Sequence, residues 1–218
     1  MTVFVFDAYG TLFDVHAAIG RYKNEAGPDA DRISDLWRTK QLEYTWTLTL
    51  AGKYEDFWVL TERALDYALA RFPSANKALK AKYLDAYLSL DAYPDARATI
   101  QALRARGLKT AILSNGSPKM LNAAVNAAGM SKDFDALLSV DSVKMFKPRM
   151  EVYKLTTDTL KVAPDDVAFC SSNRWDVMGS RAFGFRPVWV NRAKMPEEYP
   201  DLPPMKVVPD LSSLANID

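Results

Sequence analysis

The spacing of hydrophobic residues changes along the chain, and these changes predict where strands and helices lie. The first apolar run holds four residues, Val3 to Phe6, and is too short for anything except a buried strand. From residue 14 to about residue 92, apolar residues recur at helical spacing, as at Ile33, Trp37 and Tyr44. Breaks at Gly27-Pro28, Ala51-Gly52 and Phe72-Pro73 divide this stretch into three or four predicted helices.

From residue 93 onward, short apolar runs alternate with stretches of helical spacing. The expected strands cover residues 108–113, 136–140, 166–170 and 187–190, with an edge strand at 207–208. The expected helices cover residues 95–106, 118–128 and 149–160, and a last one ends near residue 183. This alternation predicts an α/β fold with a Rossmann-like, doubly wound parallel sheet. We expect residues 1–13 and 93–218 to form this core domain, with residues 14–92 inserted as a helical-bundle cap domain.

Composition and charge narrow the class of protein. The 218 residues are 49% hydrophobic and 25% charged, which is ordinary for a globular protein that buries a core. A net charge of +1 provides no field that would attract nucleic acid or an anionic membrane surface, so we expect neither as a partner. The apolar run before Asp7 is too short for a signal peptide or a membrane span. The single cysteine, Cys170, excludes an internal disulfide and suits the cytoplasm; we expect it to be a core residue.

Polar residues that could take part in catalysis or ligand binding follow the predicted strands. Asp7 stands where the first strand ends, and Tyr9-Gly10 breaks the backbone directly after it. Further polar segments follow later strands: Ser114-Asn115-Gly116, Lys147-Pro148, and Ser171-Ser-Asn-Arg-Trp-Asp176. Ligands bind at the carboxyl ends of the strands in an open parallel sheet. We therefore expect these segments to form one pocket, although each alone could be a turn or a helix entry.

The order and spacing of these segments resemble the four motifs of the haloacid dehalogenase superfamily. Asp7-Ala-Tyr-Gly-Thr11 resembles the first motif, whose Asp is a covalent nucleophile. The segment from Leu36 to Trp46 is similar to the cap segment that carries the arginine of the L-2-haloacid dehalogenases. The resemblance to these enzymes covers nearly the whole chain. It implies hydrolysis of short L-2-haloalkanoic acids to D-2-hydroxyalkanoic acids and halide, through an ester on Asp7, and it implies a homodimer.

The resemblance also assigns roles to individual residues. Asp7 would displace the halide, and Asp176 would position or deprotonate the water that hydrolyses the ester. Lys147 can keep Asp7 ionised because a nearby positive charge lowers the pKa of a carboxyl group. Arg38 would stabilise the departing halide, although helical spacing alone favours a solvated surface charge. The expected catalytic set is completed by Thr11, Ser114, Tyr153, Ser171 and Asn173. The expected substrate contacts are Ala8, Tyr9, Arg38, Phe57, Ser114, Asn115, Asn173 and Trp175.

Two departures from the phosphatases of the superfamily bear on metal dependence. In those Mg²⁺-dependent enzymes the second residue after the nucleophile is an Asp that acts as general acid, where this chain has Tyr9. The first Asp of their fourth motif is replaced by Ser172, so one carboxylate near the metal position is lost. Losing carboxylates deprives a hard cation of its preferred ligands. We therefore expect neither a metal nor another cofactor. The alternatives are a metal-dependent phosphatase or phosphonate hydrolase of the same superfamily, and a catalytically silent binding protein that kept the fold.

Overall fold

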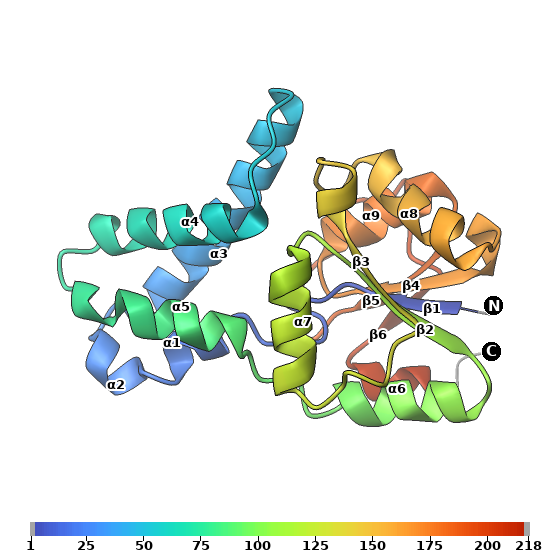
Figure 1. Ribbon diagram of the computed structural model, residues 1–218, viewed down its shortest axis with the longest axis horizontal. Helices are drawn as coiled ribbons and strands as arrows, with labels where there is room; N and C mark the ends of the chain where they lie inside the picture. The colour runs from blue at the N-terminus through green and yellow to red at the C-terminus, as the bar shows by residue number, and fades with distance from the viewer. Residues whose placement is uncertain (1–2, 216–218) are drawn as a thin grey trace.

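The computed structural model describes residues 3–215, and its centre is one parallel sheet. The six strands are ordered β3-β2-β1-β4-β5-β6 (Figure 1). They are β1 (Val3–Phe6), β2 (Lys109–Ser114), β3 (Ala136–Ser139), β4 (Val167–Ser171), β5 (Arg186–Val190) and β6 (Lys206–Val208). The predicted α/β class with a doubly wound parallel sheet is confirmed.

The first strand lies at the centre of the sheet because both of its sides are paired. Phe6 is in register with Ile112 of β2 and with Cys170 of β4. All four residues of β1 are buried, as expected for a parallel strand covered on both faces. Figure 1 shows α8 and α9 above the sheet and α6 below it. The helices of this region are α6 (Ala96–Ala105), α7 (Pro118–Ala127), α8 (Met150–Leu160) and α9 (Arg174–Phe183).

Two strands end one residue later than the apolar pattern predicts, and the difference matters for the site. Ser114 still pairs with Ser139, and Ser171 still pairs with Trp189. A polar residue can occupy the last position of a buried strand because its backbone completes the ladder while its hydroxyl reaches the edge. Both serines therefore present their side chains from rigid positions. Cys170, one residue earlier, is buried in the core as expected.

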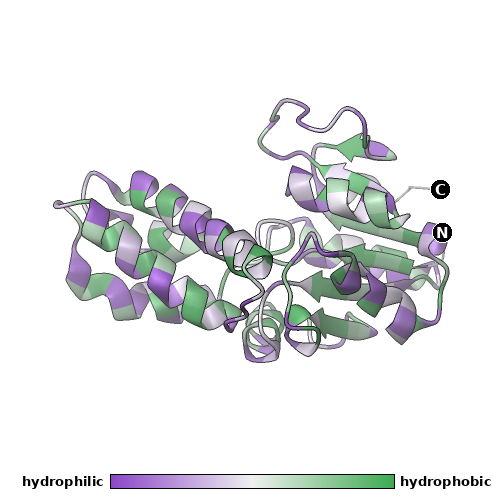
Figure 2. Cartoon of the chain, turned by 90° about the horizontal axis from the view of Figure 1, so that it is seen from above, coloured by the Kyte–Doolittle hydropathy of each residue, from purple (hydrophilic) through white to green (hydrophobic). Residues whose placement is uncertain are grey.

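The helices between β1 and α6 form a second body beside the sheet (Figure 1). They are α1 (Ala17–Gly20), α2 (Lys23–Ala26), α3 (Ala30–Leu50), α4 (Phe57–Arg71) and α5 (Lys80–Leu88). The prediction of three or four helices is wrong for the described residues, because α1 and α2 are separate single turns too short to show helical periodicity. Helices α3, α4 and α5 carry both polar and apolar residues along their length, whereas the strands are mostly apolar (Figure 2). The indole Nε1 of Trp37 donates to the Thr61 carbonyl at 2.8 Å and links α3 to α4.

The chain leaves the sheet region and returns to it at one place. Phe13 and Ala92 form an antiparallel bridge, and the Tyr93 amide donates to the Leu12 carbonyl at 2.9 Å. The outgoing and returning segments therefore lie side by side close to Asp7. Farther away, the Phe146 amide donates to Thr49 Oγ1 at 3.2 Å, so the end of α3 also touches the loop before α8. None of the helices in residues 3–215 is long and apolar enough to cross a membrane.

Candidate active site

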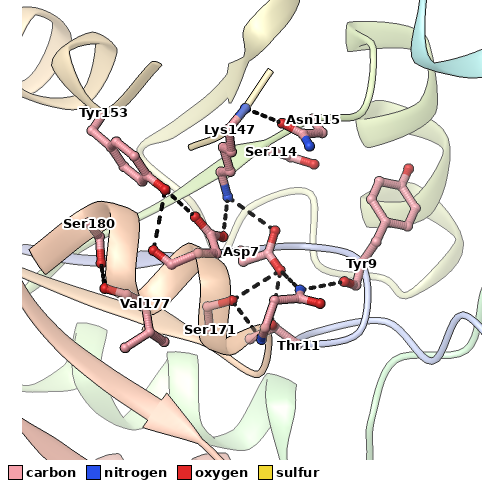
Figure 3. Close-up of polar contacts among 12 residues, drawn as sticks. Asp7, Tyr9, Thr11, Ser114, Asn115, Lys147, Tyr153, Ser171, Val177 and Ser180 are labelled. Carbon is pink, nitrogen blue, oxygen red and sulfur yellow. Dashed lines mark hydrogen bonds and ion pairs between the residues drawn. The ribbon is translucent and has the colours of Figure 1, made fainter. Parts of the chain in front are cut away.

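A lysine lies between two carboxylates at the carboxyl edge of the sheet. The Nζ atom of Lys147 is 3.2 Å from Oδ1 of Asp7 and 2.7 Å from Oδ2 of Asp176 (Figure 3). The side chains of all three residues are at most 8% exposed. Burying charged groups is costly unless they are paired and hydrogen-bonded. The arrangement satisfies that condition and holds one positive charge beside two acidic groups.

The second oxygen of Asp7 is fixed by uncharged donors. Asp7 Oδ2 accepts hydrogen bonds from Thr11 Oγ1 at 3.1 Å, Ser171 Oγ at 3.3 Å and Asn173 Nδ2 at 2.7 Å. The Ser171 hydroxyl in turn accepts from the backbone N–H of Asn173 at 3.1 Å, and the Thr11 hydroxyl accepts from the backbone N–H of Ser172 at 2.9 Å. Donors of this kind stabilise the ionised carboxylate and restrict its rotation. The network fixes the orientation of the Asp7 carboxylate, as attack on a substrate carbon requires.

Asp176 lies in the first turn of α9 and is completely buried. Its Oδ1 atom accepts from the Tyr153 hydroxyl at 2.8 Å, while its Oδ2 atom faces Lys147. Burial raises the pKa of Asp176 to about 6, against the opposing effects of Lys147 and Tyr153, and the charge of Asp7 adds to the rise. A carboxyl group that titrates near neutral pH can take up and release a proton during turnover.

Arg38 reaches this edge from α3, so its interpretation as a solvated surface charge is wrong. Its Nη2 atom donates to the Tyr9 carbonyl at 3.1 Å and to Asn173 Oδ1 at 3.5 Å. Its Nη1 atom donates to Gln41 Oε1 at 3.0 Å. The Arg38 guanidinium therefore lies next to Asn173, which also contacts Asp7.

A small cavity joins these groups. It is narrow and brings charged and apolar side chains together. Its lining residues are Asp7, Tyr9, Arg38, Leu42, Phe57, Ser114, Asn115, Asn173 and Trp175. All but Leu42 were expected from the sequence. Leu42 follows Arg38 by four residues on α3, so helical periodicity alone would have placed it on the same face.

Other predicted residues lie behind or beside the cavity. Lys147 and Tyr153 do not line the cavity themselves: Lys147 contacts both Asp7 and Asp176, and Tyr153 contacts Asp176. Asn115 lines the cavity and also accepts from the Lys147 amide at 3.0 Å. Ser114 Oγ accepts from the Gly116 amide at 3.0 Å, and Ala8 is buried directly after Asp7.

One buried arginine beside the site was not predicted to matter. Arg174 is 3% exposed, and its guanidinium donates to Glu197 Oε1 at 2.7 Å. It also donates to the carbonyl oxygens of Tyr199 and Leu202, at 2.8 and 2.9 Å. These bonds fasten the segment after β5 to the start of α9, between Asn173 and Asp176. Nothing in the local pattern of the sequence distinguishes this arginine from an exposed one.

The donor set does not suit a divalent cation of the kind used by superfamily phosphatases. The ammonium of Lys147 already lies between the carboxylates of Asp7 and Asp176. Where such phosphatases have further acidic residues, this chain presents the aromatic ring of Tyr9 and the neutral hydroxyl of Ser172, which is buried without a hydrogen-bond partner. Over residues 3–215, no three histidine, cysteine or acidic side chains group together as metal ligands. A hard cation that prefers six or more oxygen ligands would find few here.

A parallel α/β sheet with a nucleophile-like aspartate at its edge and an inserted helical region defines a class of hydrolases. Residues 1–184 match the family described as haloacid dehalogenase-like hydrolase, and the chain belongs to that family. Within it, the chain is 47% identical to (S)-2-haloacid dehalogenase 1 of Pseudomonas sp. strain CBS-3, over 98% of this chain and 94% of that protein. It is 46% identical to (S)-2-haloacid dehalogenase 4A of Burkholderia cepacia, over 96% and 91% of the two chains.

Solved structures agree with these relatives. A dehalogenase crystal structure with an intermediate complex matches 98% of this chain and 95% of its own, with a TM-score of 0.96 and 45% identity. The L-2-haloacid dehalogenase of Xanthobacter autotrophicus, with chloropropionic acid covalently bound, matches 99% and 97% of the two chains. Its TM-score is 0.90 and its identity 38%. The predicted resemblance to L-2-haloacid dehalogenases is confirmed.

Proposed function

We propose that this protein hydrolyses short L-2-haloalkanoic acids to D-2-hydroxyalkanoic acids and halide, with Asp7 as the covalent nucleophile. One observation carries the proposal: the Asp7 carboxylate is buried, fixed by three hydroxyl and amide donors and one ammonium, and open to a small cavity that also contains Arg38. A carboxylate held in this way can attack carbon with little reorganisation.

The first half of the reaction forms the ester. A carboxylate oxygen of Asp7 attacks C2 of the substrate from the side opposite the halogen, and the C–O bond forms as the carbon–halogen bond breaks. The halide leaves with the bonding electron pair towards Arg38 and Asn173, whose N–H groups stabilise the developing charge. In-line attack inverts the configuration at C2, which turns an L-2-haloacid into the D-configured ester.

The second half restores the enzyme. Water attacks the side-chain carbonyl carbon of Asp7 while Asp176 accepts its proton. The bond between that carbon and the ester oxygen then breaks, and the oxygen takes a proton to become the hydroxyl of the product. Lys147 and Tyr153 hold Asp176 in position through the 2.7 and 2.8 Å contacts on its two oxygens. The oxygen atom of the water stays on Asp7.

The substrate carboxylate needs donors that do not compete with the halide site. We assign it to the Ser114 hydroxyl, the Asn115 side chain and the backbone N–H groups of Ala8 and Tyr9, close to the nucleophile at the strand end. Phe57, Trp175 and the Tyr9 ring would contact the apolar part of the substrate.

We also propose the organisation of the enzyme. Residues 1–13 and 93–218 would be the core domain and residues 14–92 the cap domain, and the bridge between Phe13 and Ala92 supports that boundary. A homodimer fits the exposed apolar side chains of Leu50 and Val59 on α3 and α4. A cytoplasmic location fits the single, buried thiol of Cys170. Neither nucleic acid nor a membrane is proposed as a partner.

The reaction should proceed without a divalent metal. Halide release from (S)-2-chloropropionate should be unchanged after exhaustive chelation, because Lys147 supplies the cation beside the carboxylates. The (R)-enantiomer should be a poor substrate, and p-nitrophenyl phosphate should not be hydrolysed with or without Mg²⁺. If chelation removes activity that Mg²⁺ restores, or if the phosphate ester is the better substrate, the alternative of a metal-dependent phosphatase replaces this one.

Arg38→Lys should reduce turnover about a hundredfold, because a well-aimed charged donor to the leaving group contributes about 3 kcal/mol to transition-state stabilisation. Lysine keeps the charge but loses the planar fork that donates to Tyr9, Asn173 and the halide together. Steady-state halide release measures the effect. Arg32→Lys on the same helix is the matched control, since that side chain is 69% exposed and should leave turnover unchanged. Equal rates for wild type and Arg38→Lys would remove Arg38 from the halide site.

Tyr153→Phe should move the acidic limb of the kcat–pH profile to higher pH. Asp176 must be ionised to accept the proton of water, so wild-type kcat should fall as the pH drops below about 6. The Tyr153 hydroxyl stabilises the ionised form, and losing it raises the pKa of Asp176 further. Tyr67→Phe, at an exposed position on α4, serves as the control. An acidic limb that stays in place or moves to lower pH would contradict this role.

A further inference from the structure

The guanidinium of Arg38 also donates to a buried side chain that does not line the cavity. This residue, Gln41, lies one helical turn along α3 and is 1% exposed. Its Oε1 atom accepts from Arg38 Nη1 at 3.0 Å and from the Tyr87 hydroxyl at 3.2 Å. Its Nε2 atom donates to Thr61 Oγ1 at 2.7 Å. A neutral amide thus connects the arginine to α4, through Thr61, and to α5, through Tyr87.

The hydrogen bonds determine which way the amide points. The single proton of the Thr61 hydroxyl is donated to the Phe57 carbonyl at 2.7 Å, so Thr61 Oγ1 can only accept from Gln41. The Gln41 NH₂ group must therefore face Thr61, and its oxygen must face Arg38. Because Phe57 and Arg38 both line the cavity, this chain of bonds connects two of its lining residues.

We propose that Gln41 is a positioning residue that aims the Arg38 guanidinium at the departing halide without neutralising it. The inference rests on the proposed function and adds a specific requirement to it. A guanidinium has five N–H donors, and those turned to Gln41 and Tyr9 fix the plane of the group so that the remaining donors face the cavity. A carboxylate at position 41 would also hold Arg38, but its negative charge would offset the positive charge offered to the halide.

Two substitutions of Gln41 separate the loss of the hydrogen bond that positions Arg38 from the effect of a negative charge beside it. Gln41→Met keeps the length of the side chain and removes the acceptor, so Arg38 loses one of its anchors. Gln41→Glu keeps the shape and the acceptor and adds a negative charge beside Arg38. We expect either variant to lower kcat about tenfold, the effect of one charge-assisted hydrogen bond, with a smaller change in KM. The loss should be greater for 2-chloropropionate than for 2-bromopropionate, because the smaller halide depends more on hydrogen-bond donors as it leaves.

Repeating the Gln41 substitution in an enzyme that lacks Arg38 distinguishes a positioning role from a purely structural one. In an Arg38→Ala enzyme there is no guanidinium to aim, so Gln41→Met should change the residual turnover by less than about twofold. Melting temperatures of all variants show whether the fold is kept, and Gln41→Glu provides the readout if Gln41→Met does not fold. Equal losses in the two backgrounds, or equal losses for both halides, would overturn the positioning role. If the wild type releases no halide from any 2-haloacid, the proposed function itself fails, which is a separate result.

Discussion

Asp7→Asn should lower turnover by a factor of roughly 10⁴ or more, the size of loss typical when a covalent nucleophile is removed. An amide is a poor nucleophile, and its NH₂ group cannot replace the carboxylate oxygen that accepts from Thr11, Ser171 and Asn173. Halide release from (S)-2-chloropropionate is the measurement. The variant should still fold, because the side chain keeps its size at the end of β1.

The matched control for this substitution is Asp35→Asn. Asp35 lies on α3 with a side chain that is 76% exposed, so the change of charge there should leave the rate unaffected. An Asp7→Asn enzyme with a wild-type melting temperature and no turnover would assign the loss to chemistry. Appreciable halide release by a folded Asp7→Asn enzyme would mean that another group, or water itself, attacks the substrate.

Asp176→Asn should stop the reaction after its first half. Asp7 keeps its ammonium partner and its three other donors, so it should still form the ester and release one halide per active site. The amide cannot accept a proton from water, and losing a general base typically costs a factor of about 10² to 10⁴ in rate. Rapid-quench measurement should show a burst of halide followed by slow release.

Mass spectrometry of the quenched Asp176→Asn enzyme provides the companion measurement. The peptide that contains Asp7 should carry one propionate substituent after reaction with 2-chloropropionate. The wild type, which hydrolyses the ester, should carry much less. Full steady-state turnover with no accumulated ester would exclude Asp176 as the base, and failure to release even the first halide would place its role in the attack by Asp7.

The parts of the fold and site that lie on the sheet follow from sequence patterns because parallel strands impose their own geometry. Each apolar run ends at the same edge of the sheet, so polar residues that follow different strands must meet there. Asp7, Ser114 and Asn173 are far apart in sequence yet line one cavity for this reason. The end of each strand was less predictable, as Ser114 and Ser171 show, because a polar side chain can still complete the backbone pairing.

The contributions of the inserted helices depend on packing that local patterns do not encode. Periodicity places Arg38, Gln41 and Leu42 on α3 but does not set the angle at which α3 approaches the sheet. The 3.1 Å bond from Arg38 to the Tyr9 carbonyl joins α3 to the segment after β1, and family resemblance alone pointed to Arg38. Arg174 was missed for a related reason: its partners, from Glu197 to Leu202, come from an irregular segment whose path no periodicity predicts.

The central claim is that Asp7 forms a covalent ester that water later hydrolyses at the side-chain carbon of Asp7. A single-turnover reaction in ¹⁸O-water, with enzyme in excess over (S)-2-chloropropionate, tests it most directly. The oxygen given to the product then comes from Asp7, and the oxygen of water remains on the enzyme. We predict that the first product is unlabelled and that mass spectrometry finds ¹⁸O in the Asp7 carboxylate. Label in the first product, with none in Asp7, would show that water attacks the substrate directly and would contradict the account.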